Sequence, residues 1–312
     1  MLPDRLEGCL TGIALGDSLG LPMEAIKGPR SRKMFHGRLR QRMIAGRGLL
    51  SDDTLMAVAT VIALNRSPED SEQFAVELGR LLRAWFWTIP PGIGLATLRS
   101  CLKLTLGSKA SKAGVYSAGN GAAVRAVVLG CIFSAAPERR QEFITASTRV
   151  THTHPLAENG SQLAGLAAAT ATNGDVSSFR VEANELLPDW PWSDSYPDNG
   201  PTGFIVHTMN AAVECWLRDP SDIEKSLTSA ISLGGDTDSV AAIVGGLVGA
   251  ARDCSKPRSI WFQWVGWPQR RDLHLIANAK AKKLPILRLA AQHAFGLAVI
   301  LPHALRRLLP PY

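Results

Sequence analysis

Apolar residues recur at helical spacing along most of this chain, and this periodicity limits the possible folds more than any other feature. Phe74, Leu78, Leu81, Leu82 and Trp85 lie at spacings of three and four, which places them on one helical face. The same pattern predicts helices over about 55–62, 122–133, 139–150, 159–172, 203–217, 221–231 and 239–251. Alternation typical of strands is scarce. The sequence therefore predicts an all-α fold, a single compact multi-helix bundle.

Capping and helix-breaking residues mark the ends of several predicted helices. Ser67, followed by Pro68 and two acidic residues, predicts a helix start, because a hydroxyl can cap the free N–H groups and proline suits the first helical turn. Pro90, Pro91 and Gly92 predict the end of that helix. The stretch 187–202 is rich in proline and lacks periodicity, so we expect an ordered surface loop there.

Composition places the chain among globular proteins. With 312 residues, 46% of them hydrophobic and 20% charged, it can bury a large core. No linker is evident, so we expect one domain over residues 1–255 and a helical extension over 256–312 packed on the same domain. The five cysteines have no paired spacing, which favours a reducing compartment. Neither a signal peptide nor a membrane-spanning segment is expected, and the prediction is a cytoplasmic monomer without membrane association.

The net charge of +7 is concentrated in a segment between residues 27 and 47 that contains no acid. Its cations are Lys27, Arg30, Arg32, Lys33, Arg38, Arg40, Arg42 and Arg47. The simplest interpretation is a solvated loop. The functional alternatives are a positive rim that attracts a phosphate-bearing ligand, or a nucleic-acid interface. Because Phe35 is the only aromatic residue interleaved with the cations, nucleic acid is the less favoured alternative.

Two acidic doublets lie at the predicted starts of apolar helices. Asp52 and Asp53 follow Ser51, and Asp236 and Asp238 follow a glycine pair. Either doublet alone is more simply explained as helix capping, because the first turn favours negative charge. Together they are better explained by hard divalent cations, since four carboxylates at two helix starts would otherwise repel one another. A binuclear site that uses both doublets accounts for the duplication.

Three further segments carry polar residues that could serve such a site. Asp17 lies in a glycine-rich helix, where a buried carboxylate should be paired, and Glu24 follows the helix-ending Pro22 at the start of the basic segment. In Ser117–Arg125, glycines flank Asn120 just before a helix, which would offer N–H groups to a phosphate. His152 and His154 have no partners at zinc-ligand spacing, so His152 is interpreted as a hydrogen-bonding residue.

Taken in order, these motifs resemble those of the ADP-ribosylglycohydrolase family. The segments GDSLGLPME, SDDT, SAGNGAAVR, THTHP and LGGDTDSVAAIVGGLVGA carry the resemblance, which covers roughly residues 6–252. The SDDT and GGDTDS segments are its most specific parts. The family includes the dinitrogenase-reductase-activating glycohydrolase and the mammalian ADP-ribosyl-acceptor hydrolases. The resemblance implies a compact all-α bundle that holds two Mg²⁺ or Mn²⁺ ions.

The resemblance also implies roles for individual residues. The implied metal ligands are Ser51, Asp52, Asp53, Asp236, Asp238 and Ser239. The implied ADP-ribose contacts are Ser117, Gly119, Asn120, Gly121 and His152. Glu24, Asp53 and Asp238 are the candidates for the catalytic carboxylate. The chain has serine at positions 51 and 239 where the family usually has threonine, so the hydroxyl is kept and the methyl group that fixes its rotamer is lost.

The implied activity is hydrolysis of the glycosidic bond between ADP-ribose and an acceptor, which reverses ADP-ribosylation. Arginine-linked ADP-ribose on a protein is the first expectation. The alternatives are a hydrolase of a free derivative such as O-acetyl-ADP-ribose, a non-catalytic ADP-ribose-binding or structural relative, and a nucleic-acid-associated hydrolase. Retention of all the ligand aspartates favours an enzyme over a non-catalytic relative.

Overall fold

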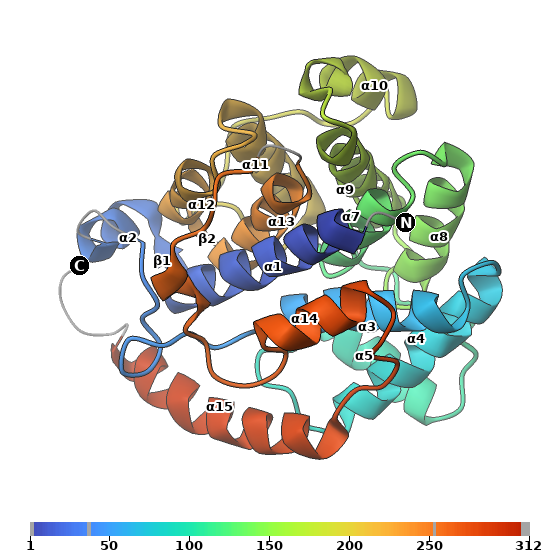
Figure 1. The fold of residues 1–312 in the computed structure, drawn as a ribbon, viewed down its shortest axis with the longest axis horizontal. Helices are drawn as coiled ribbons and strands as arrows, with labels where there is room; N and C mark the ends of the chain where they lie inside the picture. The colour runs from blue at the N-terminus through green and yellow to red at the C-terminus, as the bar shows by residue number, and fades with distance from the viewer. Residues whose placement is uncertain (1–2, 36–38, 252–253, 307–312) are drawn as a thin grey trace.

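The computed structural model describes residues 3–35, 39–251 and 254–306, and nearly all of its regular structure is helical (Figure 1). The helices are α1 (Pro3–Gly20), α2 (Gly28–Phe35), α3 (Asp52–Arg66), α4 (Ser71–Phe86), α5 (Leu95–Thr105), α6 (Ala110–Ala113), α7 (Ala123–Ile132), α8 (Pro137–Arg149), α9 (Pro155–Asn173), α10 (Phe179–Leu186), α11 (Ile205–Arg218), α12 (Ile223–Ser232), α13 (Thr237–Ala250), α14 (Arg270–Ala277) and α15 (Ile286–Arg306). Short 3₁₀ turns lie at Leu21–Met23, Val176–Ser178 and Ser259–Phe262. The predicted all-α fold is confirmed.

Helices α1 and α13 form the centre of the molecule and approach each other through small residues. A Cβ atom added to Gly12 would lie 1.9 Å from the Gly245 carbonyl oxygen, and one on Gly16 would lie 1.9 Å from that of Ala241. The contacts run in opposite order along the two helices, from Gly8 beside Gly249 to Gly20 beside Thr237. The helices are therefore antiparallel, and the C-terminal end of α1 lies beside the start of α13.

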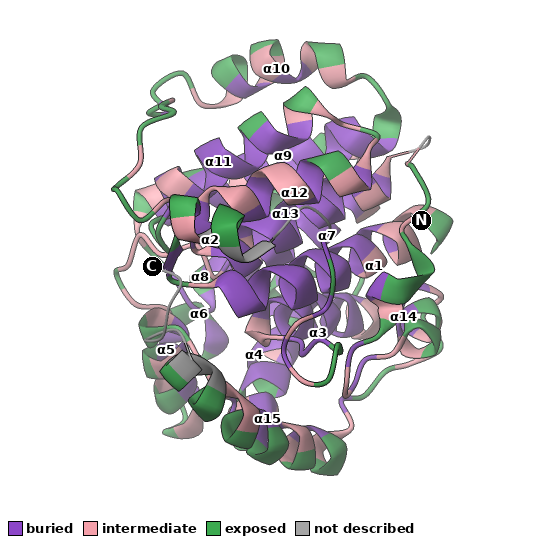
Figure 2. Cartoon of the chain, turned by 90° about the vertical axis from the view of Figure 1, so that its left-hand side faces the viewer, coloured by how far each residue is buried: buried purple, intermediate pink, exposed green. Residues whose placement is uncertain are grey.

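The other buried helices surround this pair. Helix α7 packs against α9 and α3, while α12 and α11 pack against α13. Figure 2 shows the resulting centre of buried residues, with α10 and α15 at the periphery, where exposed residues dominate. Helix α3, whose residues from Asp53 to Leu64 are all buried, brings the first acidic doublet into the interior.

A two-residue strand pair explains the glycines that precede Asp236. Strand β1 (Ile26–Lys27) pairs antiparallel with β2 (Gly234–Gly235). Gly234 and Gly235 have φ angles of 79° and 71°, in the left-handed region that favours glycine. A Cβ on Gly235 would also lie 2.0 Å from the Pro201 carbonyl oxygen. The pairing holds the chain just after Glu24 against the start of α13.

Two local predictions are wrong. Ser67 lies at the C-terminal end of α3, and the start of α4 is capped instead by Asp70, whose carboxylate accepts the N–H groups of Glu72 and Gln73 at 2.9 Å. The helix therefore begins three residues later than predicted, and an acidic side chain rather than a hydroxyl accepts the N–H groups of its first turn. The basic segment is not simply a loop, because β1 and α2 occupy residues 26–35, while Arg38 lies outside the described residues.

The segment after residue 255 contributes to the same hydrophobic core. Trp261, Trp264 and Trp267 are buried, and Leu273 and Ile276 from α14 join the cluster that contains α1 and α13. Helix α15 lies along the edge of the molecule beyond α14 (Figure 1). Among the described helices, none combines the length and apolarity that a bilayer crossing requires.

Candidate active site

The start of α3 is held by Asp17, which points from α1 toward it. Both carboxylate oxygens of Asp17 accept the Ser51 N–H at 3.0 Å, and one accepts the Thr54 hydroxyl at 2.5 Å. Ser51 is the N-cap of α3, and its hydroxyl accepts the Asp53 N–H at 3.1 Å. Asp17 is therefore paired as expected, and the capping function at this helix is met by Ser51, which leaves the Asp52 and Asp53 carboxylates for another purpose.

The start of α13 carries the second doublet. Asp236 is the N-cap residue, yet its side chain makes no capping bond and instead accepts the Asn120 side-chain amide at 2.7 Å. Asp238 is 7% exposed, and its Oδ1 has no hydrogen-bond partner among the described residues. The Ser239 hydroxyl lowers the pKa of Asp53, the Asp236 charge raises it, and the Asp53 charge in turn raises the pKa of Asp238, so the two helix starts lie close enough to influence each other. Capping alone does not account for this doublet.

Crowding and burial raise the pKa of these carboxyl groups. Burial, with hydrogen bonds opposing it, raises the pKa of Asp17 to about 6. Burial and then the Asp17 charge raise the pKa of Asp52 to about 7. The pKa values of Asp53 and Asp238 also lie well above the ordinary range, first because of burial and then because of neighbouring carboxylates. Among the described residues, no lysine or arginine is a leading cause of the pKa shifts at Asp52, Asp53 and Asp238, so no cation of the protein is seen to balance these charges.

The donor set fits hard divalent cations, which prefer carboxylate and hydroxyl oxygens. Asp238 Oδ1 is a buried oxygen without a hydrogen-bond partner in the described part of the chain, and the mutual repulsion within the cluster would be relieved by a bound cation. Within the described part of the chain, no three carboxylate, imidazole or thiolate groups lie close enough together to hold an ion as they stand. Holding an ion therefore requires these side chains to turn toward it.

Glu24 lies at the edge of this carboxylate cluster. It follows the 3₁₀ turn Leu21–Met23 and is half-buried, and its charge contributes to the raised pKa values of Asp52 and Asp238. The next residue, Ala25, donates its N–H to the Gly235 carbonyl oxygen at 2.7 Å. Glu24 is thus placed beside both doublets by a backbone that is itself bound to the start of α13.

The predicted glycine loop reaches the carboxylate cluster through Asn120. The Asn120 side chain donates to Thr208 at 2.8 Å as well as to Asp236, and its backbone N–H donates to the Gly203 carbonyl oxygen at 3.0 Å. The Gly119 N–H donates to the Ser117 hydroxyl at 3.2 Å. Some N–H groups of the loop therefore already donate to acceptors within the protein. Among the described contacts, the N–H groups of Gly121 and Ala122 have no acceptor, and they precede α7 directly.

His152 lies beneath the glycine loop and supports it. A Cβ on Gly119 would lie 3.1 Å from His152 Nε2, and one on Gly121 would lie 3.3 Å from His152 Cε1, so a side chain at either position would press against the imidazole ring. Burial and then the charge of Arg125 lower the pKa of His152 to about 3. His152 is therefore a neutral side chain with Nε2 toward the loop, while His154 instead caps α9 by accepting the Leu156 N–H.

Several residues that shape this region were not predicted from the sequence. Arg125 is fully buried, donates to the Ser147 carbonyl oxygen at 3.0 Å and the Thr151 hydroxyl at 2.6 Å, and forms no salt bridge within the described residues. Thr151 in turn contacts His152 Nδ1 at 2.8 Å. Thr208 and the exposed Phe204 flank Asn120 from the start of α11. The arginine within the apolar run of α7 was the available signal.

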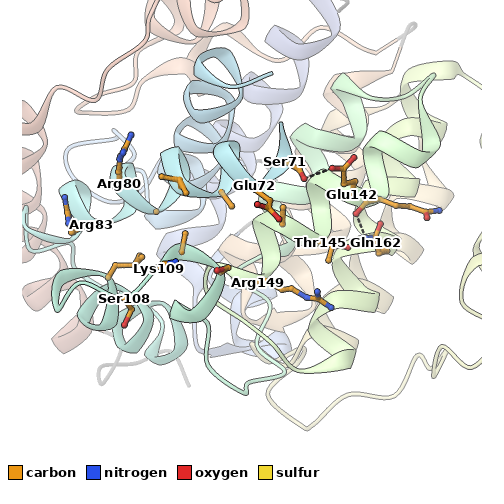
Figure 3. A pocket seen from close by; sticks show the side chains of 18 of the residues that line it. Ser71, Glu72, Arg80, Arg83, Ser108, Lys109, Glu142, Thr145, Arg149 and Gln162 are labelled. Carbon is orange, nitrogen blue, oxygen red and sulfur yellow. Dashed lines mark hydrogen bonds between the residues drawn. The ribbon is translucent and has the colours of Figure 1, made fainter. Parts of the chain in front are cut away.

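Of two cavities in the structure, one is lined by predicted site residues and the other is not. A narrow cavity of about 100 Å³ is lined by Glu24, Ser51, Asp52 and Asp238 together with residues of α15. A much larger pocket of about 1120 Å³ lies between α4, α6 and α8 (Figure 3). Arg83 and Lys109 lie on one side of this pocket and Glu142 on the other (Figure 3), and none of the predicted site residues lines it. The carboxylate cluster opens to the narrow cavity.

Comparison with known proteins shows the family of this chain. The model of the family described as ADP-ribosylglycohydrolase matches residues 1–284, and this chain belongs to that family of hydrolases. The ADP-ribosyl-[dinitrogen reductase] glycohydrolase of Rhodospirillum rubrum is 26% identical over 287 residues, covering 88% of this chain and 95% of that protein. The ADP-ribosylarginine hydrolase Tri1 of Pseudomonas putida is 29% identical over 293 residues, covering 85% and 75%.

The fold comparison leads to the same architecture. A solved structure of an ADP-ribosylglycohydrolase-related protein complex superposes with a TM-score of 0.68 and 23% identity, covering 93% of this chain and 98% of that one. The family match ends at residue 284, before α15 begins at Ile286. Helix α15 therefore lies outside the part of the chain that the family model describes.

Proposed function

We propose that this protein is a metal-dependent hydrolase that cleaves the glycosidic bond between ADP-ribose and an acceptor. The observation that carries the proposal is the convergence of two distant helix starts, whose carboxylates raise one another's pKa values, and their connection to the glycine loop by the hydrogen bond from Asn120 to Asp236. Family membership supports hydrolysis of ADP-ribose linkages as the reaction class.

Six residues would hold the two Mg²⁺ or Mn²⁺ ions of the proposal. They are Ser51, Asp52 and Asp53 at the start of α3, and Asp236, Asp238 and Ser239 at the start of α13. When bound, such ions supply positive charge that binds ribose hydroxyls and lowers the pKa of a water molecule. Asp17 acts on this cluster indirectly, because it fixes the backbone of Ser51 and the hydroxyl of Thr54.

A carboxylate of this cluster would accept the proton of the attacking water. Glu24, Asp53 and Asp238 are the candidates. Asp53 and Asp238 are also proposed metal ligands, whereas Glu24 is not. The departure of the acceptor leaves positive charge on the ribose ring, which nearby carboxylates stabilise electrostatically. The burial that raises the pKa values of Asp52, Asp53 and Asp238 also strengthens such interactions, because the local dielectric constant is low.

The glycine loop would bind the ADP portion of the substrate. The N–H groups of Gly121 and Ala122, just before α7, have no acceptor among the described residues, and a helix start favours a phosphate. Ser117, Gly119 and Asn120 complete the loop, with the neutral His152 below it. Arginine-linked ADP-ribose is the proposed substrate, supported by the relative named ADP-ribosylarginine hydrolase.

The test is a release assay on a panel of substrates. The protein is incubated with ADP-ribosyl-arginine protein, ADP-ribosyl-serine peptide and O-acetyl-ADP-ribose, each with Mg²⁺, Mn²⁺ or a chelator, and free ADP-ribose is measured. We expect release that requires a divalent ion, with the arginine linkage preferred. Asp53→Asn and Asp238→Asn should abolish it, whereas the exposed control Asp189→Asn should not. Full activity of either cluster variant, or binding of ADP-ribose without release from any substrate, contradicts the proposal.

A further inference from the structure

The narrow cavity beside the carboxylate cluster has a wall made by α15. Glu24, Asp52 and Asp238 line it together with Gln292, His293 and Gly296 of α15. The rest of the lining is mainly apolar and includes Leu21, Leu49, Leu50, Pro91 and Ile300. The cavity therefore combines carboxylates of the proposed reaction site with apolar side chains and part of α15.

Helix α15 is fixed in this place by buried polar contacts. His293 is 4% exposed, and its Nδ1 contacts the Thr88 hydroxyl at 2.8 Å and the Thr88 carbonyl oxygen at 3.2 Å. The Gln292 side chain accepts the Trp267 N–H at 2.6 Å and donates to the Trp267 carbonyl oxygen at 3.1 Å. These contacts tie α15 to the end of α4 and to the tryptophan-rich segment, so its wall is part of the folded structure.

The position of the glycine loop indicates which part of the substrate the cavity would hold. None of the loop residues from Ser117 to Gly121 lines the cavity, and neither does His152. If the proposed function is correct, the ribose lies at the carboxylates and the phosphates extend to the loop. The group on the far side of the anomeric carbon is the acceptor, and this cavity adjoins the carboxylates without being lined by the loop.

We propose that this cavity is the acceptor subsite and that α15 restricts it to slender acceptors. This inference rests on the proposed function. A volume of about 100 Å³ is smaller than the roughly 150 Å³ of a cavity that holds benzene, so the site admits an unbranched chain and excludes a nucleobase. The apolar walls suit an aliphatic stem, with its linked polar end at the carboxylates. The substrate class is therefore ADP-ribose on a small molecule or on a flexible peptide side chain.

The structure offers two substitutions that change the cavity in opposite directions. Gly296 faces space, because a Cβ added there meets only Pro91 Cγ, at 3.6 Å, and Gly296→Leu therefore fills the cavity. Ile300→Ala widens it. Leu297→Ala is the matched control, because Leu297 is 47% exposed on the same helix and does not line the cavity.

The test compares acceptors of different width on full-length variants. The ratio kcat/KM is measured on ADP-ribosyl-arginine and on an ADP-ribosylated folded protein, and the Kd of ADP-ribose is measured by calorimetry with Mg²⁺. We expect Gly296→Leu to lower kcat/KM on both by about tenfold or more, with the Kd of ADP-ribose changed less than about twofold. Ile300→Ala should raise kcat/KM on the folded protein severalfold relative to the small substrate, and Leu297→Ala should change neither.

The outcomes separate this inference from the proposed function. If the unmodified protein releases ADP-ribose but Gly296→Leu and Ile300→Ala leave both kcat/KM values unchanged, the cavity is not the acceptor subsite and the proposed function stands. A parallel loss of ADP-ribose affinity in Gly296→Leu would also overturn the inference, because the cavity would then hold the ADP-ribose portion itself. If the unmodified protein releases no ADP-ribose from any substrate, the proposed function fails, and the inference fails with it. Thermal melting shows whether Gly296→Leu is folded, and Ile300→Ala decides the question if it is not.

Discussion

The side-chain amide of Asn120 donates to the Asp236 carboxylate at 2.7 Å, so the glycine loop and the second acidic doublet form one hydrogen-bonded unit. The sequence motifs that contain these residues suggested two separate tasks, phosphate binding and metal binding. Asn120 also donates to Thr208, which fixes the amide orientation. A change at Asn120 should therefore affect both tasks.

Asn120→Ala should weaken ADP-ribose binding and also reduce the stabilisation of the protein by Mg²⁺. Removing a hydrogen bond to a charged group costs about 1.5–3 kcal/mol, which corresponds to about tenfold or more in affinity. Calorimetry with ADP-ribose and thermal melting with and without Mg²⁺ measure the two effects. Asn184→Ala, on the peripheral helix α10, is the control. Loss of ADP-ribose affinity with unaltered Mg²⁺ stabilisation would show that the two tasks are separate.

Close packing of α1 on α13 should make Gly16 intolerant of any side chain. A Cβ there would lie 1.9 Å from the Ala241 carbonyl oxygen, so the helices must separate to admit it. Gly16→Ala should lower the free energy of unfolding by about 1–3 kcal/mol or more, measured by chemical denaturation. Gly94→Ala is the control, because its Cβ meets nothing within 4 Å. Equal stability of the two variants would refute the close contact.

Metal-free protein should lose stability as the pH rises from about 4 to 7. The pKa is raised to about 6 for Asp17 and to about 7 for Asp52, so the folded state binds more protons than the unfolded chain in this range. Unfolding then releases protons, and the free energy of unfolding falls with pH, by about 3 kcal/mol for Asp17 alone. Below pH 4 this contribution is fully retained, and above pH 7 it is lost.

Chemical denaturation in the presence of a chelator, repeated across this pH range, measures how the free energy of unfolding changes with pH. Asp17→Asn should flatten the part between pH 4 and 6, whereas Asp198→Asn, on the exposed loop before α11, should not. Saturating Mg²⁺ should restore stability at pH 7, because a bound cation favours the ionised carboxylates. A metal-free stability that rises through this range would contradict the raised pKa values.

Glu24→Gln should impair catalysis far more than folding. Glu24 is half-buried and its charge raises the pKa of its neighbours, so removing the charge relieves repulsion and costs little stability. If Glu24 transfers the proton of the attacking water, kcat should fall by about 10²–10⁴-fold with a nearly unchanged melting temperature. Glu72→Gln, in the remote pocket of Figure 3, is the control. A sharp fall in melting temperature with an unchanged rate would make Glu24 a structural residue.

The helices and the acidic doublets were predictable because their patterns are local. The apolar stripe from Phe74 to Trp85 predicted α4, and the duplicated doublets predicted that capping was insufficient. The start of α4 was misplaced because Ser67 and Asp70 are both good caps, and local sequence does not decide between them.

The contacts between distant segments were not predictable from these patterns. Asn120 beside Asp236 depends on how α7 and α13 pack, and Arg125 beneath His152 depends on the turn between α8 and α9. Helix α15 carries an apolar pattern with no motif, so nothing local indicated that Gln292 and His293 would line a cavity with Asp52. Such relationships follow from packing geometry, which periodicity does not encode.

The most direct test of the central claim is an anomalous difference map from crystals grown with Mn²⁺. The account predicts two Mn²⁺ peaks at this cluster. Carboxylate oxygens from both helix starts should lie about 2 Å from these ions, from Asp52 or Asp53 of α3 and from Asp236 or Asp238 of α13. Peaks bound by one helix start alone, or no peak at this cluster at a saturating Mn²⁺ concentration, would contradict the account.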